Sequence, residues 1–416
     1  MAALNSGDIS WMLTSSALVL LMTPGLAFFY GGLVKRKNII NTMISSIFIM
    51  GLASVLWVLV GYSLSFSGDI GGIIGNLQWF ALNGVGSEPG IYAATIPNLC
   101  FAIFQMMFAI ITPALITGGV VERMKFSSLF VFIAFWSILV YYPLAHMVWG
   151  GGFLQQIGSI DFAGGNVVHI SSGVSALVLA IILGKRRNIE KATYHPHNVP
   201  FVLLGAALLW FGWFGFNAGS AGAANDVAVR AFMATNTAAA SALLSWMLIE
   251  KIHSGKPTLV GACTGLVVGL VAITPGAGFV PIWASIIIGG LVSPICYFAI
   301  TYLKPKFGYD DALDAFGCHG IGGIWGGIAT GLFAQTSLNP AVKWDGLVYG
   351  EWTLFFKQLE AVGITILIAI AGTLVAVGIA KLITKNIRVG AKEESIGLDI
   401  SEHGESAYPA FNGMDN

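Results

Sequence analysis

The amino-acid sequence predicts an all-α integral membrane protein with eleven transmembrane helices. The chain has 416 residues, of which 56% are hydrophobic and only 10% are charged. Soluble globular proteins average about 25% charged residues, so this chain has too few charges to cover a water-soluble surface. Its 53 glycines are roughly twice the average share, and small residues let membrane helices pack closely. The net charge of zero gives no basic surface for nucleic acid.

Apolar runs of about 20 residues predict helices that cross a bilayer. Several of the runs are interrupted by Gly or Pro, and the last one is longer than a single span requires. The eleven runs cover residues 10–33, 41–64, 97–121, 127–149, 163–184, 198–219, 227–249, 258–274, 280–303, 312–334 and 352–384. The first run lacks the features of a cleaved signal peptide, so we expect it to remain in the mature protein.

The positions of Lys and Arg predict an external N-terminus and a cytoplasmic C-terminus. Cytoplasmic loops carry an excess of basic residues, and with this orientation only Arg230, Lys343 and Lys357 lie outside or within a span. The remaining basic residues all fall in alternate connections or in the tail, which supports an odd number of helices. They are Lys35, Arg36, Lys37, Arg123, Lys125, Lys185, Arg186, Arg187, Lys191, Lys251, Lys256, Lys304, Lys306, Lys381, Lys385, Arg388 and Lys392.

The chain is predicted to form a membrane domain, residues 1–384, and a cytoplasmic regulatory tail, residues 385–416. Within the membrane domain we expect two five-helix repeats, at about 10–184 and 198–334, followed by the final helix 352–384. Because five is odd, the two repeats must have opposite orientations, which is the arrangement of inverted-repeat transporters with a central substrate path.

Matching polar residues in the fifth and tenth spans support these repeats. Asp161 precedes His169 in one span, and Asp314 precedes His319 in the other. Ionisable groups inside a membrane are costly and usually line a pathway, so the two histidines are candidates for a central pore. The alternative is that each histidine is satisfied separately in the helix packing. No further ligands stand at the spacing of a zinc or haem site, so we expect no metal and no cofactor.

The two aspartates have two possible roles. A carboxylate at the start of a helix caps backbone amides and favours the helix dipole, so a structural role is expected for Asp161 and Asp314. The alternative is indirect electrostatic support for an incoming cation. The acidic pair Asp310 and Asp311 is interpreted in the same way.

Aromatic residues gather in the predicted outer half of the membrane domain. Phe108, Trp149, Trp213 and Phe216 lie there, together with Ser220. Each aromatic on its own is typical of an interfacial belt or of core packing. Together they could hold a cation over their ring faces, an interaction worth about 2 kcal/mol or more when desolvated, and a serine hydroxyl could accept a hydrogen bond from a protonated amine.

Five stretches of the chain resemble ammonium transporters of the Amt/Mep/Rh superfamily, in its Amt branch. The stretches are TPGLAFFYGG at 23–32, AHMVWGGG at 145–152, DFAGGNVVH at 161–169, WFGFNAGS at 213–220 and FGCHG at 316–320. The tail also resembles the regulatory C-terminus of that family, and the segment around Gly397, Asp399 and Gly404 suggests a docked conformation.

The resemblance implies roles for individual residues at the outer end of a pore. Trp149, Ser220 and Phe108 would bind ammonium, Phe108 and Phe216 would form a stacked gate, and Asp161 would support the outer site.

The resemblance also implies a pore and an assembly. His169 and His319 would be the pore pair, with Trp213 and Tyr141 lining the pore nearby. A homotrimer with one pore per subunit is implied, as is a PII-type signalling partner at the cytoplasmic face.

The expected function is therefore ammonium transport across a cell membrane. Ammonium would be deprotonated near the gate and cross as ammonia, with or without a separate proton route. The alternatives are an ammonium sensor or transceptor and a neutral gas channel of the Rh type. An enzyme is not expected, because the sequence contains no nucleophile–base pair or phosphate-binding loop.

Overall fold

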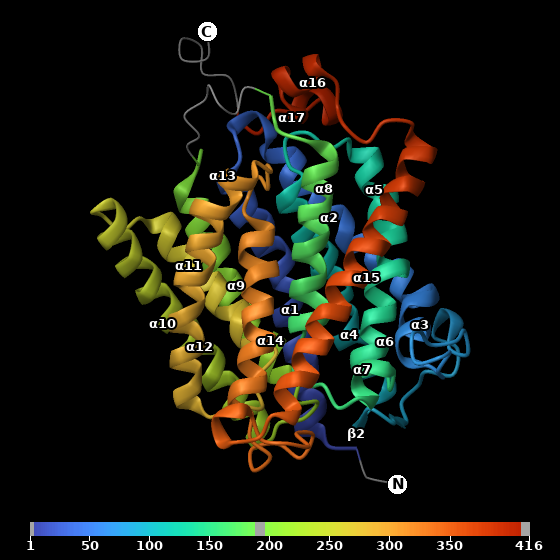
Figure 1. The fold of residues 1–416 in the computed structure, drawn as a ribbon. Helices are drawn as coiled ribbons and strands as arrows, with labels where there is room; N and C mark the ends of the chain where they lie inside the picture. Colours follow the sequence, from blue (N-terminus) through green and yellow to red (C-terminus); the bar gives the residue numbers. More distant parts are fainter. Residues whose placement is uncertain (1–3, 188–195, 409–416) are drawn as a thin grey trace.

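The computed structural model describes residues 4–187 and 196–408. Figure 1 shows a bundle of long helices, with the N-terminus at one end and the tail helices at the other. Such an arrangement agrees with an odd number of crossings and with the predicted N-out, C-in orientation. Lys191 and residues 409–416 of the predicted tail lie outside the described residues.

Among the described residues of the first half of the chain, the main helices form five continuous segments, three of which contain a π-helical turn. In order, they are α1 (Ser6–Leu33), α2 (Ile39–Leu56), η2 (Trp57–Gly61), α3 (Tyr62–Phe66), α4 (Asn98–Ile116), α5 (Phe126–Trp136), η5 (Ser137–Tyr141), α6 (Tyr142–Trp149), η6 (Gly165–Ile170) and α8 (Ser171–Leu183). The connections carry the short elements η1 (Arg36–Asn38), η3 (Phe80–Leu82), β1 (Pro89–Gly90), β2 (Ala93–Pro97), η4 (Thr117–Gly119) and α7 (Phe153–Gln156). Strands β1 and β2 pair antiparallel at the end of the bundle that bears the N-terminus.

The second half forms the remaining helices and the tail. Its elements are α9 (Val199–Gly219), α10 (Asp226–Ser254), α11 (Leu259–Ile273), α12 (Ile282–Phe298), η7 (Ala299–Leu303), α13 (Lys304–Phe307), η8 (Phe316–Gly320), α14 (Ile321–Phe333), η9 (Leu347–Tyr349), α15 (Thr353–Thr384), α16 (Ala391–Ile396) and α17 (Leu398–His403).

Nine of the predicted spans are confirmed by length and composition among the described residues. The eighth predicted span corresponds to α11, which has only 15 residues. The tenth corresponds to η8 followed by α14, where the helix begins late because the chain is irregular before Phe316. The protein is therefore a multi-pass membrane protein, and the full count of eleven crossings stays a prediction.

Glycines bring equivalent helices of the two predicted repeats into direct contact. In the first and sixth spans, α1 and α9, a Cβ on Gly205 would lie 2.6 Å from both the carbonyl oxygen of Gly25 and the Cα of Phe29. In the fifth and tenth spans, a Cβ on Gly173 would collide with the backbone of Gly320. Pairing of the first span with the sixth, and of the fifth with the tenth, is what two related halves would produce. The repeat boundaries remain a prediction.

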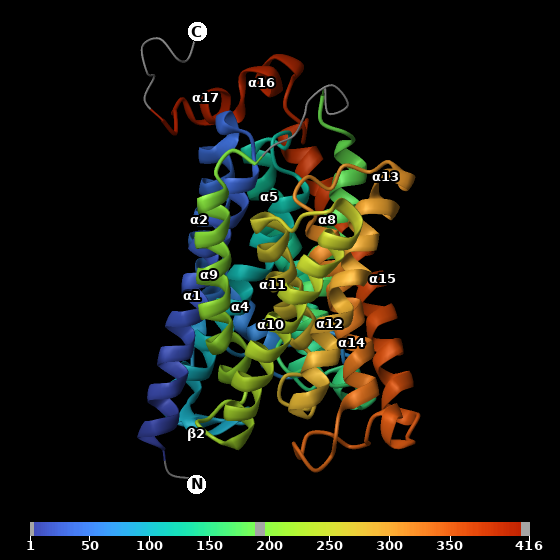
Figure 2. The same cartoon turned by 90° about the vertical axis from the view of Figure 1, so that its left-hand side faces the viewer.

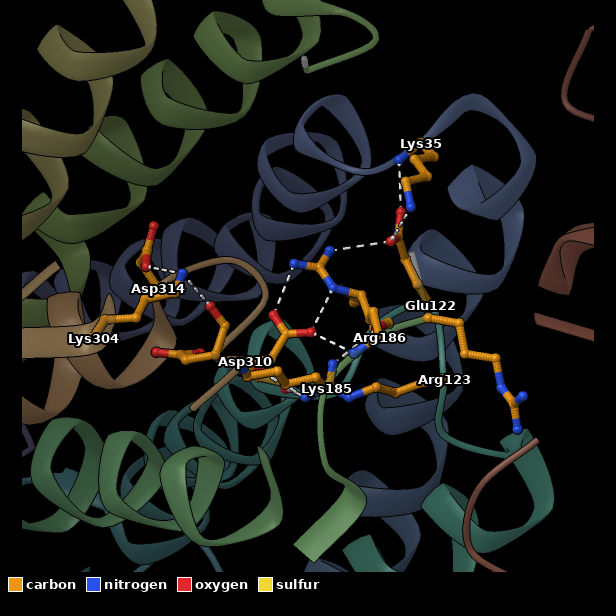
Figure 3. A network of polar contacts seen from close by, with 12 residues as sticks. Lys35, Glu122, Arg123, Lys185, Arg186, Lys304, Asp310 and Asp314 are labelled. Carbon is orange, nitrogen blue, oxygen red and sulfur yellow. Dashed lines mark hydrogen bonds and ion pairs between the residues drawn. The ribbon is translucent and has the colours of Figure 1, made fainter. Parts of the chain in front are cut away.

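A buried ionic network ties the cytoplasmic connections together (Figure 3). The guanidinium of Arg186 bonds both oxygens of Asp310 at 2.9 Å, and Nη1 of Arg186 lies 3.1 Å from Glu122. Glu122 also accepts a hydrogen bond from the backbone amide of Lys35 at 2.9 Å. Burial would raise the pKa of Asp310, but the bonds and charge of Arg186 and the charge of Arg123 outweigh burial and hold this pKa below its ordinary value.

The tail is docked on this end of the bundle, as its sequence suggested. Figure 2 shows α16 and α17 lying across the bundle close to α2 and α5. Asp399 accepts a hydrogen bond from the amide of Asn41 at 2.8 Å, and Glu402 accepts one from the amide of Phe126 at 2.9 Å. Gly397 has φ 113° and Gly404 has φ 66°, a region that favours glycine.

The contact between Gly173 and Gly320 predicts a stability defect for Gly173→Ala. The added methyl group has no room, and overpacking of this kind costs about 1–3 kcal/mol. We expect a clear fall in the thermal unfolding temperature of the detergent-solubilised protein. The matched control is Gly363→Ala in α15, where no heavy atom lies within 4 Å of the added Cβ. Equal unfolding temperatures for the two variants would contradict the close contact.

Candidate functional site

Two π-helical turns, η6 and η8, carry the pore histidines predicted from the sequence. His169 lies in η6 and His319 in η8, and each turn continues into an α-helix of 13 residues, α8 or α14. In the bundle, α8 and α14 run in opposite directions (Figure 1). π-helical turns inside helices are rare and occur frequently at functional sites.

A buried carboxylate secures the start of η6. Oδ1 of Asp161 accepts hydrogen bonds from the amides of Gly164 at 2.8 Å and Gly165 at 2.7 Å, and Oδ2 accepts one from Asn166 at 2.7 Å. The carbonyl oxygen of Asp161 also accepts the indole N–H of Trp149 at 2.8 Å. Asp161 thus has the expected capping role, and through Trp149 it also joins η6 to α6.

The predicted cap at Asp314 is not what the structure shows. At η8 the capping residue is Asp311, whose oxygens accept the amides of Ala315 at 3.0 Å and Phe316 at 2.8 Å. Asp314 instead pairs with Nζ of Lys304 at 2.6 Å (Figure 3). Its φ of 58° is uncommon for a residue with a Cβ, and it turns the side chain away from the helix start.

The two histidines meet inside the bundle. Their Nδ1 atoms lie 3.3 Å apart, and their rings are nearly parallel, with an interplanar angle of 17°. Because a neutral imidazole has one donor and one acceptor nitrogen, one ring donates to the other. Nε2 of His169 is buried without a hydrogen-bond partner among the described residues. This nitrogen is therefore free to bond a small polar molecule.

A narrow apolar cavity surrounds the histidine pair. The space open to the centre of a water molecule is about 10 Å³. A cavity of this size holds roughly one water molecule. The cavity is lined by Met22, Leu26, Phe29, Ile111, Leu115, Val168, His169, Leu209, Trp213, Phe216, Val267 and His319. Only a very small molecule fits into this cavity without side-chain movement.

Aromatic rings close the cavity toward the end that bears the N-terminus. The centroids of Phe108 and Phe216 lie 4.3 Å apart, and Phe216 lies 6.0 Å from His169. Phe108 contacts Trp149 edge to face at 6.0 Å. Both phenylalanines are buried, whereas Trp149 is partly exposed. The rings form a continuous series from Trp149 through the phenylalanine pair to His169.

Three other predicted site residues, Trp213, Ser220 and Tyr141, lie outside this series of rings. Trp213 stacks on His169 at 5.4 Å, and Ser220 donates to the carbonyl oxygen of Phe216 at 2.9 Å, which leaves its oxygen lone pairs open. Tyr141 packs edge to face on Tyr142 at 6.0 Å and is not among the residues that line the cavity. That Tyr141 lines the pore beside the histidines stays a prediction.

Sequence reasoning missed one residue that orients the pore. Thr274, just after α11, accepts the indole N–H of Trp213 at 2.9 Å, and this bond fixes the ring that stacks on His169. Threonine in an apolar run gives no distinctive signal. Within residues 4–187 and 196–408, no cluster of three or more His, Cys, Asp or Glu is arranged to hold a metal ion.

Comparison with known proteins identifies the family. Residues 10–408 match the model of the Ammonium Transporter Family. The chain belongs to the ammonium transporter family. The ammonium transporter of Bacillus subtilis is 53% identical over 402 residues, covering 97% of this chain and 98% of that protein.

Solved structures of other ammonium transporters share the fold. Mep2 of Saccharomyces cerevisiae superposes with a TM-score of 0.86 at 37% identity, covering 94% of this transporter and 89% of the Mep2 chain. A sensor Amt protein superposes with a TM-score of 0.84 at 28% identity, covering 95% and 98% of the two chains. The curated relatives are named as transporters and not as enzymes.

The hydrogen bonds of Asp161 predict a graded loss of stability in this transporter. Asp161→Ala leaves at least three buried amides without an acceptor, at about 1–3 kcal/mol each, whereas Asp161→Asn keeps one acceptor oxygen. We expect the thermal unfolding temperature to fall in the order wild type, Asn variant, Ala variant. The control is Asp226→Ala at the exposed start of α10. An Ala variant of Asp161 as stable as this control would contradict the capping role.

Proposed function

We propose that this protein transports ammonium across a cell membrane by capturing the cation at an outer aromatic site and conducting ammonia past the histidine pair. The carrying observation is the continuous series of rings from Trp149 to His169, which ends at an unpartnered ring nitrogen in a narrow apolar cavity. Family membership and the names of the relatives support the same substrate.

Trp149, Phe108 and Ser220 form the proposed capture site. Aromatic faces attract a cation, and the Ser220 oxygen can accept an N–H bond because its own hydrogen is donated to Phe216. Asp161 contributes indirectly, by holding the indole of Trp149 through its carbonyl oxygen.

Deprotonation takes place at the stacked phenylalanines in this proposal. An ion at the centre of a bilayer costs from about 3 to above 10 kcal/mol, and the apolar walls beyond Phe216 do little to offset that cost. Neutral ammonia crosses far more cheaply and can bond Nε2 of His169. Potassium resembles ammonium in size and charge but has no proton to lose, so it is rejected. The released proton either returns outside or crosses by a separate route along the histidines.

Assembly and regulation follow from the family resemblance. We propose a homotrimer with one pore in each subunit, and a PII-type signalling protein as a partner of the cytoplasmic face. The docked tail, which bonds α2 and α5 through Asp399 and Glu402, supports a regulatory role for residues 385–416.

A second candidate function is ammonium sensing. The structural similarity to a sensor Amt protein supports it. A neutral gas channel of the Rh type is less well supported, because Trp149 and Ser220 form an outer site suited to a cation.

Transport itself is tested by reconstituting the protein in liposomes and applying an ammonium pulse, with a potassium pulse as control. An ammonium-specific current would show that net charge crosses, and a change of internal pH without current would show conduction of neutral ammonia. The absence of both signals, in protein shown to be folded and trimeric, would contradict transport and favour the sensor.

The capture site predicts a loss of apparent affinity in Trp149→Leu. Removing a cation–π contact of about 2 kcal/mol corresponds to a rise in KM for ammonium of roughly 10- to 30-fold, with a smaller effect on the maximal rate. The control is Trp352→Leu, because Trp352 is 59% exposed at the start of α15 and contacts Phe355 and Phe356 rather than the pore. Equal KM values for the two variants would rule out Trp149 as a capture residue.

The histidine pair predicts a loss of selectivity in His169→Asp. A carboxylate in the cavity stabilises a cation there, so we expect potassium currents that the wild type lacks. The control is His253→Asp, because His253 bonds Tyr297 and Tyr302 outside the pore. Unchanged selectivity and flux in His169→Asp would contradict conduction of neutral ammonia past this residue.

A further inference from the structure

A third buried histidine, His146, links α6 to the external connection that follows α3. Its side chain is fully buried. Nδ1 lies 3.1 Å from the carbonyl oxygen of Ser65 in α3, and Nε2 lies 3.1 Å from Oδ1 of Asp69 in the external connection. The proposed pore uses neither nitrogen, so these bonds need another explanation.

The hydrogen-bond partners define the protonation state of His146. A carbonyl oxygen can only accept, so Nδ1 carries a proton. Asp69 also accepts the amide of Gly72 at 2.8 Å, and the pKa of its carboxyl lies below the ordinary value because of the bond from His146 and then that amide. An ionised carboxylate can only accept as well. With an acceptor at each ring nitrogen, the geometry fits a His146 ring that is protonated on both nitrogens, with Asp69 balancing its charge.

The ion pair lies where the chain turns after Trp149. His146 belongs to the last turn of α6, where a cation is favoured by the helix dipole. Its carbonyl oxygen accepts the amides of Gly150 at 2.9 Å and Gly152 at 3.0 Å. A Cβ on Gly150 would lie 2.8 Å from Nδ1 of His146, so the ring and the turn fit without spare room.

The same external connection is bonded on the other side of Trp149. The carbonyl oxygen of Gly72 accepts the amide of Phe153 at 2.7 Å, and Asp69 accepts the amide of Gly72. Asp69 thus anchors a short segment that contacts the chain both before and after the tryptophan.

We propose that the His146–Asp69 ion pair is a positioning device that holds Trp149 in place for ammonium capture. This inference rests on the proposed role of Trp149. The ring of His146 bonds Ser65 and Asp69 at the same time, and so ties the last turn of α6, which ends at Trp149, to the external connection. Removing the bond to Asp69 loosens this anchor, and ammonium capture weakens.

Other titratable groups near α6 have separate partners. Tyr62 donates to Asn98, and Tyr92, in the same external connection as Asp69, donates to the carbonyl oxygen of Phe66. The carboxylate of Asp161 is occupied by backbone amides, and His169 bonds His319. The hydroxyl groups of Tyr141 and Tyr142 are buried. Among the described residues, Asp69 is the one charged group that bonds the ring of His146.

The first test measures protonation directly and does not depend on transport. Nitrogen-15 NMR of histidine-labelled protein in lipid nanodiscs reports which ring nitrogens carry protons. We expect one imidazole protonated on both nitrogens, with its signal lost in His146→Gln. A neutral tautomer at His146 would overturn the proposal.

The second test measures KM for ammonium at one external pH. Asp69→Asn keeps an accepting oxygen but removes the charge, so a purely structural contact survives while the ion pair does not. We expect KM to rise about three- to tenfold, with the maximal rate unchanged.

The control variant is Glu88→Gln, which removes the same charge from an exposed position of the same connection. We expect this control to match the wild type. Identical KM values for Asp69→Asn and Glu88→Gln would overturn the positioning role. A failure of the capture site itself is recognised separately, because Trp149→Leu would then leave KM unchanged whatever the NMR result.

Discussion

Backbone amides that begin a helix inside a membrane-embedded bundle have no water to bond, and two buried aspartates supply their acceptors. An unsatisfied amide in such surroundings costs several kcal/mol. Asp161 binds the first amides around η6, and Asp311 binds those at the start of η8. Because η6 carries His169 and η8 carries His319, these carboxylates determine where the two histidines meet. The proposed pore therefore depends on two groups that are not among the residues lining the cavity.

In the proposed site, the aromatic rings and the imidazole nitrogens have separate roles. Aromatic faces at the outer end suit a cation, whereas the cavity behind them has apolar walls and a single pair of imidazoles. A shared hydrogen bond between the two Nδ1 atoms turns a nitrogen of His169 toward the cavity without requiring a charge. That division fits the proposed change of protonation between the two regions, by which ammonium would be separated from potassium.

Charged groups are concentrated at the cytoplasmic end, where water and partners are available. Arg186 connects Asp310 to Glu122, and Arg388 of the tail bonds the carbonyl oxygen of Leu183 at the end of α8. Since α8 begins at η6, the tail contacts the far end of the helix that carries His169. At the external end, the proposed anchor of α6 and Trp149 is the contact between His146 and Asp69.

The sequence alone was enough to predict the class of protein, and it named the residues of the proposed site. Sparse charge and long apolar runs require a membrane, the alternation of basic residues predicts the orientation, and two histidines inside spans point to a shared pore. Those features depend on composition and spacing, which determine directly whether a segment prefers water or the membrane. Tertiary structure decided which aspartate caps η8, how closely the two histidines approach, and that His146 is bonded to Asp69. Each of these depends on the direction of a side chain, which backbone angles such as the positive φ of Asp314 and contacts between distant segments determine.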